Sequence, residues 1–491
     1  MKKQTYYIAV GTIAVAVGAL AITNQSFWID EGGAAMHATQ RTLHDWWQSL
    51  RAEGNSNLQL ILQQFYLWGW GKIFGPSEIA LRASNIPWFV AGVLALVWAF
   101  PEKRCLQNGI VAVTLSNAFV WYYLSEARPY IVLFAFSALT VACLIRTAQI
   151  SRESIQSAAH FRLFCIGAVG MCATSLIAVP WAMAATVGLA ILIGRQGLKN
   201  TIHKYPLTAL LFVAAIGGLG LFYLWTMKLG ARASDVGRTG LANIGFIFYE
   251  LAGLAGLGPG RLALRNENLS THIAYLPFVI VGLAAVASLF VAACRRQWNE
   301  TDKRRIMFFV IIAVAPFVFV LSAGVVGNVR LLGRHFVPLL PLLLIVLGEG
   351  VCRLFSSESK TERAIAVGAL GILLLSALEI RFASRHQRDD YRTASAEARR
   401  ALVDQKKVWW AADASTAAYY GVPLDSPDLT FSSSLSDRSF ETLPPPDLVY
   451  FSKPDIYDPH GKIDNYLRAH DFKVTRVLPA FQIFERPADR R

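Results

Sequence analysis

Two adjacent carboxylates, Asp30 and Glu31, directly follow the first apolar run of the chain, in the stretch 27–31 (FWIDE). Charges are costly inside a bilayer and cheap at its edge, so this position predicts a site at the membrane surface. The alternative is that the pair only stops the helix and solvates its end. Neighbouring residues on a helix point about 100° apart, so we expect the two carboxylates to have different tasks.

Further ionisable and aromatic residues fall in connections that the order of apolar runs assigns to the same side of the membrane. They are Glu126, Arg128 and Tyr130 in the connection 125–130 (SEARPY), and Arg334 and His335 before the tenth apolar run. Each also has a local explanation, because Glu126 could pair with Arg128 and the other cations could snorkel to the interface. Their common side nevertheless indicates one site.

This combination suits transfer of a group away from a lipid phosphate. A carboxylate can take the proton of an attacking hydroxyl, and cations stabilise the departing phosphate. We predict Asp30 as the base, with Glu31 and Glu126 orienting the acceptor. The same three carboxylates could hold a divalent metal, Mg²⁺ or Mn²⁺. The residues expected at the phosphate are Arg128, Tyr130, Arg334 and His335.

The composition describes a polytopic membrane protein, since 54% of the 491 residues are hydrophobic and only 16% are charged. The net charge of +14 could suggest a nucleic acid partner. However, the Lys and Arg residues concentrate in short connections between apolar runs, as the positive-inside rule predicts for cytoplasmic loops. The six cysteines lie in or beside apolar runs, so neither a disulfide framework nor a cysteine zinc site is expected.

The apolar runs predict an α-helical membrane protein with about eleven spans. The expected spans are 7–23, 79–100, 109–124, 129–145, 161–178, 181–193, 206–227, 274–294, 306–323, 336–351 and 364–380. The basic residues of the connections place the N-terminus in the cytoplasm, and an odd number of spans then places the C-terminal segment outside. The fifth and sixth spans are short and could form a tight hairpin or be partly re-entrant. The first run also fits a signal peptide, although the spans that follow favour a retained anchor.

Two other regions complete the predicted organisation around the catalytic membrane domain 1–380. The stretch 31–78 is amphipathic and rich in tryptophan, which is typical of helices in the plane of the interface, and two such helices are expected. The segment 228–272 is expected to form a long outer loop. The segment 381–491 has the composition of a soluble domain. Its expected elements are a helix 391–403, strands 408–412 and 448–451, a helix near 464–469, and closing strands around Val474 and Gln482. This small α/β unit has no glycine fingerprint for a nucleotide, so a structural cap or acceptor-docking module is expected.

Four motifs, at 27–31, 74–82 (FGPSEIALR), 125–130 and 333–341 (GRHFVPLLP), together with the interfacial helices, carry a resemblance to a known family. The chain resembles the polytopic glycosyltransferases of the C superfamily (GT-C), which use polyprenyl-phosphate sugars. It is most similar to the branch of the bacterial aminoarabinose transferase of lipid A and the protein O-mannosyltransferases. The likeness covers the membrane part, about three quarters of the chain. It implies a bacterial inner membrane protein with a periplasmic C-terminal domain.

The resemblance also implies roles for individual residues. Asp30 matches the acidic residue of the first outer loop that transfer requires, and Glu126 matches the acidic position of the second loop. Arg128 and Arg334 match basic positions near the donor phosphate. Many relatives carry His-Pro-Pro where this chain has 56–59 (SNLQ), so the sugar and the acceptor, whether a glycan, a lipid or a protein, stay open.

Two alternatives from other classes are a transporter or flippase of lipid-linked sugars and a non-catalytic membrane scaffold. A transporter would more typically place polar groups near the middle of the membrane, whereas these spans keep ionisable residues near their ends. A scaffold gives no reason for acidic and basic groups from separated loops to share one face. We therefore favour sugar transfer.

Overall fold

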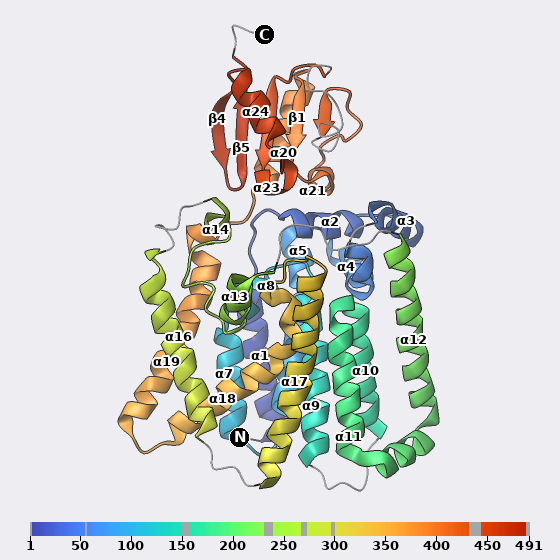
Figure 1. The fold of residues 1–491 in the computed structure, drawn as a ribbon, viewed down its shortest axis with the longest axis vertical. Helices are drawn as coiled ribbons and strands as arrows, with labels where there is room; N and C mark the ends of the chain where they lie inside the picture. The colour runs from blue at the N-terminus through green and yellow to red at the C-terminus, as the bar shows by residue number, and fades with distance from the viewer. Residues whose placement is uncertain are drawn as a thin grey trace.

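The computed structural model describes residues 2–54, 56–149, 158–229, 239–266, 273–295, 300–431 and 443–487. A bundle of long helices carries a small domain with a β-sheet at one end (Figure 1). The N-terminus lies at the opposite end of the bundle, as expected for an odd number of crossings. The predicted polytopic helical architecture with a C-terminal α/β unit is therefore confirmed.

Nine segments of the described chain are long and apolar enough to span a membrane. They are α1 (Lys3–Ala21), α5 with α6 (Glu78–Ala83 and Asn85–Trp98), α9 (Tyr130–Gln149), η2 with α11 (Leu176–Ala178 and Val179–Lys204), α12 (Pro206–Lys228), α16 (Leu276–Cys294), the part Phe308–Val326 of α17 (Glu300–Val326), η3 with α18 (Gly333–Leu339 and Leu340–Ser356), and α19 (Lys360–Phe382). Each coincides with a predicted span.

The other two predicted spans are helical but shorter. The run 109–124 is divided at Asn117 into α7 (Arg104–Ser116) and α8 (Ala118–Leu124), because the extended Asn117 caps α8 with its side chain. The run 161–178 contains α10 (Ala158–Thr174), a helix of 17 residues. The total of eleven spans thus remains a prediction. Helices α10 and α11 run side by side as a hairpin, and α11 bends at Gly194 before it continues where an inner loop was expected (Figure 1).

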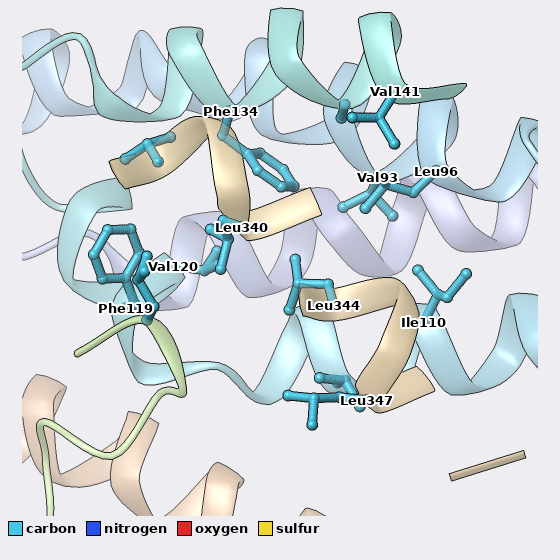
Figure 2. Packing of buried hydrophobic residues seen from close by; sticks show 14 of the residues in the cluster. Val93, Leu96, Ile110, Phe119, Val120, Phe134, Val141, Leu340, Leu344 and Leu347 are labelled. Carbon is cyan, nitrogen blue, oxygen red and sulfur yellow. The ribbon is translucent and has the colours of Figure 1, made fainter. Parts of the chain in front are cut away.

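The interior of the bundle forms around α18. Figure 2 shows Leu340, Leu344 and Leu347 of α18 among apolar side chains from α6, α7, α8 and α9. Their spacing of three and four residues places them on one face of the helix, which explains why this face is buried. Such a continuous apolar core keeps the ends of α8 and α9, and the connection between them, in fixed positions.

A disulfide joins Cys105 of α7 to Cys352 of α18, although the sequence indicated no disulfide framework. The two helices approach closely because glycines meet at their contact: a Cβ added at Gly109 would lie 2.2 Å from the carbonyl oxygen of Gly348. The two cysteine Cα atoms are 5.3 Å apart although 247 positions separate them in the chain. The spacing of the cysteines in the sequence does not indicate that Cys105 and Cys352 lie close together.

Helices at one end of the bundle lie beneath the C-terminal domain (Figure 1). These are α2 (Ile29–Ala38), α3 (Leu43–Glu53), η1 (Ser56–Gln59) and α4 (Ile61–Phe74). The amphipathic stretch thus forms three α-helices rather than the expected two. In the predicted outer loop 228–272, the structure describes α13 (Leu241–Leu251) and α14 (Ala263–Asn266), whereas 230–238 and 267–272 lie outside the described residues.

The C-terminal domain contains a five-stranded sheet of order β2-β1-β3-β5-β4, parallel among the first three strands and antiparallel between the others. Its elements are η4 (Ser384–His386), α20 (Tyr391–Val403), β1 (Val408–Ala411), α21 (Ala414–Tyr419), β2 (Leu429–Phe431), β3 (Leu448–Ser452), α23 (Pro454–Tyr457), α24 (Lys462–Ala469), β4 (Lys473–Leu478) and β5 (Phe481–Glu485). All predicted elements are present. The short elements α21, β2 and α23 were not predicted, since each has too few residues to show a period.

Candidate active site at one end of the membrane bundle

Asp30 lies in the first turn of α2, where the positive end of the helix dipole favours a carboxylate. Its Oδ2 atom accepts a hydrogen bond of 2.8 Å from Nη1 of Arg334, and its backbone oxygen accepts one of 3.0 Å from Nη1 of Arg128. Burial acts to raise the pKa of Asp30, but Arg334, Arg128 and Lys453 outweigh it and hold the pKa below its ordinary value. About a quarter of the side chain, 26%, stays exposed. Asp30 is thus an ionised and accessible carboxylate.

Glu31 occupies a closed environment one residue further along. Its side chain is fully buried and accepts two hydrogen bonds from Arg82, of 2.9 Å to Oε1 and 2.7 Å to Oε2. The backbone N–H of Ala127 donates to Oε1 at 2.9 Å, and Nη1 of Arg388 donates to Oε2 at 2.7 Å. Burial opposes ionisation, yet Arg82 and Arg388 keep the pKa of Glu31 below its ordinary value. Both oxygens are therefore occupied by the protein itself.

Glu126 is also fully buried, but neither of its carboxylate oxygens has a hydrogen-bond partner among the described residues. Nη1 of Arg388 lies 3.7 Å from Oε1 of Glu126. Burial raises the pKa of Glu126, Glu31 acts in the same direction, and Arg388 and Arg261 oppose the shift. Glu126 is therefore suited to bind or exchange a proton at a higher pH than an ordinary carboxylate.

Arg128 and Arg334 each have a hydrogen-bond donor that is not used within the described chain. Besides the contact with the backbone of Asp30, Nη1 of Arg128 donates to Oδ1 of Asn57 at 2.7 Å. The Nε atoms of Arg128 and Arg334 are buried and have no hydrogen-bond partner within the described chain. Buried donors are nearly always paired in native proteins, so two such groups beside one carboxylate indicate a place for an anionic ligand.

The two remaining predicted residues lie close to Arg334. The ring of Tyr130, at the start of α9, has its centroid 6.0 Å from the guanidinium carbon of Arg334. His335 follows Arg334 in η3, and its Nδ1 atom accepts a hydrogen bond of 3.0 Å from the backbone N–H of Leu332. The imidazole thus holds the turn that carries Arg334. All seven predicted residues gather at this end of the bundle.

Several residues of the site were not predicted. Arg82 and Arg388 contact Glu31, and Arg261 pairs with Glu250 at 2.7 Å. Glu250 also accepts a hydrogen bond of 2.9 Å from the N–H of Gly333, which fixes the start of η3. Arg82 is the last residue of the motif 74–82, and this position is the signal that the sequence offers for it. Nothing in the local pattern around Arg388 or Arg261 separates these arginines from ordinary surface cations.

The C-terminal domain packs directly on α2. A Cβ added at Gly32 would lie 2.0 Å from Oγ1 of Thr416, so only glycine permits this approach of α21. Ser415 of the same helix donates to Glu53 of α3 at 3.0 Å. The domain also brings Lys453 close enough to Asp30 to lower its pKa. The candidate site thus lies between the bundle and the domain.

The predicted metal-binding set does not fit this arrangement. No three His, Cys, Asp or Glu side chains of the described residues are placed to hold one ion. Both oxygens of Glu31 already bind arginine or backbone donors, and Asp30 pairs with Arg334, so neither faces Glu126 as a common ligand. Arg334 thus binds Asp30, whereas Arg82 and Arg388 bind Glu31.

The overall fold of the chain is similar to that of solved structures. No family model matches the sequence, and no curated protein matches it. Solved structures of ArnT from Cupriavidus metallidurans are similar at 12% sequence identity, over 99% of this chain and 98% of theirs. The TM-score is 0.55 for the apo state and 0.54 for the structure bound to undecaprenyl phosphate. The predicted resemblance is thereby confirmed at the level of architecture: the chain shares the overall fold of ArnT.

Proposed function

We propose that this protein is a membrane glycosyltransferase that moves a sugar from a polyprenyl-phosphate donor to a hydroxyl group of an acceptor, on the side of the membrane that carries the C-terminal domain. The observation that carries the proposal is the contact of the partly exposed, ionised Asp30 with Arg334 and Arg128, each of which retains a buried donor that has no partner among the described residues. A protein of the same fold with undecaprenyl phosphate bound supports this choice of donor.

In the proposed reaction, Asp30 accepts the proton of the acceptor hydroxyl while that oxygen forms a bond to C1 of the sugar. The bond between C1 and the phosphate oxygen breaks, and its electron pair stays on the phosphate. The products are the glycosylated acceptor, polyprenyl phosphate and a protonated Asp30, which returns its proton to water. The low pKa of Asp30 keeps it ready for the next turnover at neutral pH.

Arg128 and Arg334 are assigned to the leaving phosphate. Their spare Nε donors can bind phosphate oxygens, and this contact strengthens as negative charge develops in the transition state. Arg334 now pairs with Asp30, so an arriving phosphate competes with the carboxylate for the same guanidinium. Donor binding would thereby release Asp30 as a stronger base.

Glu31 and Glu126 receive different roles in this scheme. Glu31, whose two oxygens already bind Arg82, Arg388 and a backbone donor, holds the first turn of α2 in place. Glu126 has free hydrogen-bonding capacity within the described chain and is assigned to orient the acceptor hydroxyl. No step of the scheme depends on a metal ion, because the carboxylates do not form a common ligand set. We further propose a bacterial inner membrane location with a cytoplasmic N-terminus.

The test is release of free polyprenyl phosphate from a polyprenyl-phosphate sugar by purified protein in detergent, with a membrane extract as acceptor. The wild type is compared with Asp30→Asn and with the control Asp464→Asn, which changes an exposed carboxylate of α24. We expect the wild type and the control to release the carrier, and Asp30→Asn to be slower by about two to four orders of magnitude.

Donor binding and the melting temperature of the three proteins are measured in parallel. Equal binding and stability assign the loss in Asp30→Asn to the chemical step. If the wild type releases no carrier but moves labelled lipid-linked sugar across a vesicle bilayer, the transfer proposal fails and transport replaces it.

A further inference from the structure

Lys453 has an unusual backbone conformation for a residue with a side chain. It directly follows β3 and precedes α23, with φ 45° and ψ 73°, in the left-handed region that favours glycine. A lysine persists in this conformation only where the surrounding contacts impose it, and such strain is concentrated at functional sites. The strain alone does not identify the role of Lys453, which has to be inferred from the contacts of its side chain.

The side chain of Lys453 is directed toward the membrane site. The residue is only 7% exposed, although lysine is rarely buried. Its ammonium group pairs with Asp389, in the connection between α19 and α20, and lies 5.6 Å from the centroid of the Trp28 ring. Lys453 therefore reaches from the C-terminal domain to the residue that caps α2, two positions before Asp30.

Trp28 receives a second cation from the membrane bundle. The guanidinium carbon of Arg334 lies 5.7 Å from the Trp28 ring, and the same arginine binds Asp30. A cation over an indole face is attracted by the negative potential of the ring. The indole Nε1 atom is buried and has no hydrogen-bond partner within the described residues. Trp28 is thus held by one cation from each domain.

We propose that Lys453, although it belongs to the C-terminal domain, is a positioning residue of the membrane site, which fixes Trp28 and thereby the turn that carries Asp30. The inference rests on the proposed function, in which Asp30 is the base. It also means that the site is incomplete without the C-terminal domain. The competing explanation is an ion pair between Lys453 and Asp389 that only docks the domain.

The charges around Asp30 agree with this role. The charged and titratable groups that face Asp30 are Arg334 and His335 from η3, Arg128 from the connection before α9, Lys453 from the end of β3, Asp413 at the start of α21, and Tyr457 from α23. Lys453 is the cation from the domain side that lowers the pKa of Asp30. Its removal should therefore be measurable at Asp30 itself.

The experiment titrates Asp30 by infrared difference spectroscopy in the full-length protein, with the Asp30 signal identified by its absence in Asp30→Asn. Three variants are compared with the wild type. Lys453→Met removes the charge and keeps the apolar stem, and Lys453→Gly also relieves the backbone. Gln405→Gly is the matched control, because Gln405 is exposed, has φ 57° and belongs to the same domain.

We expect the Asp30 titration to move upward by about one pH unit in both Lys453 variants and not in Gln405→Gly. The acidic limb of the pH profile of kcat/KM should shift in the same direction, because the base must be ionised. Lys453→Gly relieves the backbone, but both Lys453 variants leave Asp389 buried without its partner and should therefore unfold at a lower temperature than the wild type. The shift of the Asp30 titration, which a docking role alone would not produce, separates positioning from stability.

The proposal is overturned if Asp30 titrates as in the wild type in both Lys453 variants while their melting temperatures fall, since Lys453 is then a docking residue only. The infrared measurement needs no substrate. An inactive wild type would therefore refute the proposed function, whereas an unchanged Asp30 titration would refute the role of Lys453.

Discussion

The neighbouring residues Asp30 and Glu31 belong to two regions that differ in how many of their charged groups have hydrogen-bond partners. In the Asp30 region (Asp30, Arg128 and Arg334), the carboxylate is partly exposed and two guanidinium donors have no partner within the described chain. In the Glu31 region (Glu31, Arg82 and Arg388), the carboxylate is fully buried and both of its oxygens are bound.

This difference shows how neighbouring residues of the same charge can serve separate purposes. A buried ion pair costs desolvation when it forms, and breaking it by removing one partner leaves a charge in an apolar interior. Such a pair holds its segments in place, but its donors and acceptors are already used and cannot bind a ligand. Donors without partners, in contrast, gain free energy when an anion arrives. We therefore assign stability to the Glu31 region and chemistry to the Asp30 region.

The largest effect that would test this comparison is on stability. Glu31→Gln should lower the free energy of unfolding by about 3–5 kcal/mol, because Arg82 remains buried without its carboxylate. The measurement is thermal or denaturant unfolding in detergent, with Glu362→Gln as a control at an exposed pair. A stable Glu31→Gln protein that has lost only activity would place Glu31 in the chemistry and remove the distinction between the regions.

The next effect is on catalysis. Arg334→Gln should lower kcat by about 100-fold, because a donor aimed at the developing phosphate charge is lost, and should leave stability nearly unchanged. Single-turnover release of polyprenyl phosphate measures the first quantity, and unfolding measures the second. Arg353→Gln, at an i,i+4 pair on α18, is the matched control. If kcat falls no more in Arg334→Gln than in the control, the assignment of Arg334 to the leaving phosphate is wrong.

The stability that the Glu31 region contributes should also depend on pH. The pKa of Glu31 is lower in the folded protein than in the unfolded chain, so its stabilising contribution is complete above about pH 4.3 and is lost as the pH falls through the folded value. The wild type should therefore lose up to about 1.4 kcal/mol more per pH unit than Glu31→Gln in this range. Parallel pH dependences of the two proteins would contradict the depressed pKa.

The smallest effect concerns Glu126, which is buried like Glu31 but whose oxygens have no hydrogen-bond partner among the described residues. Glu126→Gln should raise stability at neutral pH by about 1 kcal/mol, because a buried charge without a hydrogen bond is replaced by a neutral amide. The folded pKa of Glu126 is raised, so the wild type gains stability as the pH falls through it, and the difference between the two proteins should close. Unfolding across this pH range tests both expectations, and a destabilised variant at neutral pH would show that Arg388 already compensates the charge.

The sequence by itself determined the helical architecture and the face of the membrane on which chemistry is expected. Hydropathy and periodicity are local properties, and the apolar runs, the elements of the C-terminal domain and the acidic pair after the first span can all be read from a few consecutive residues. Asp30, Arg128 and Arg334 were expected together because charges beside apolar runs mark a membrane surface.

Only the tertiary structure decided which of these charged groups stays accessible to a ligand. Glu31 is closed by Arg82, 51 positions away, and by Arg388, 357 positions away, and the same packing brings Lys453 to Trp28 and Cys105 to Cys352. No local pattern distinguishes such residues from surface cations or unpaired cysteines. Pairing between distant segments depends on how helices and domains pack, and a charge becomes structural or reactive according to the partners that this packing supplies.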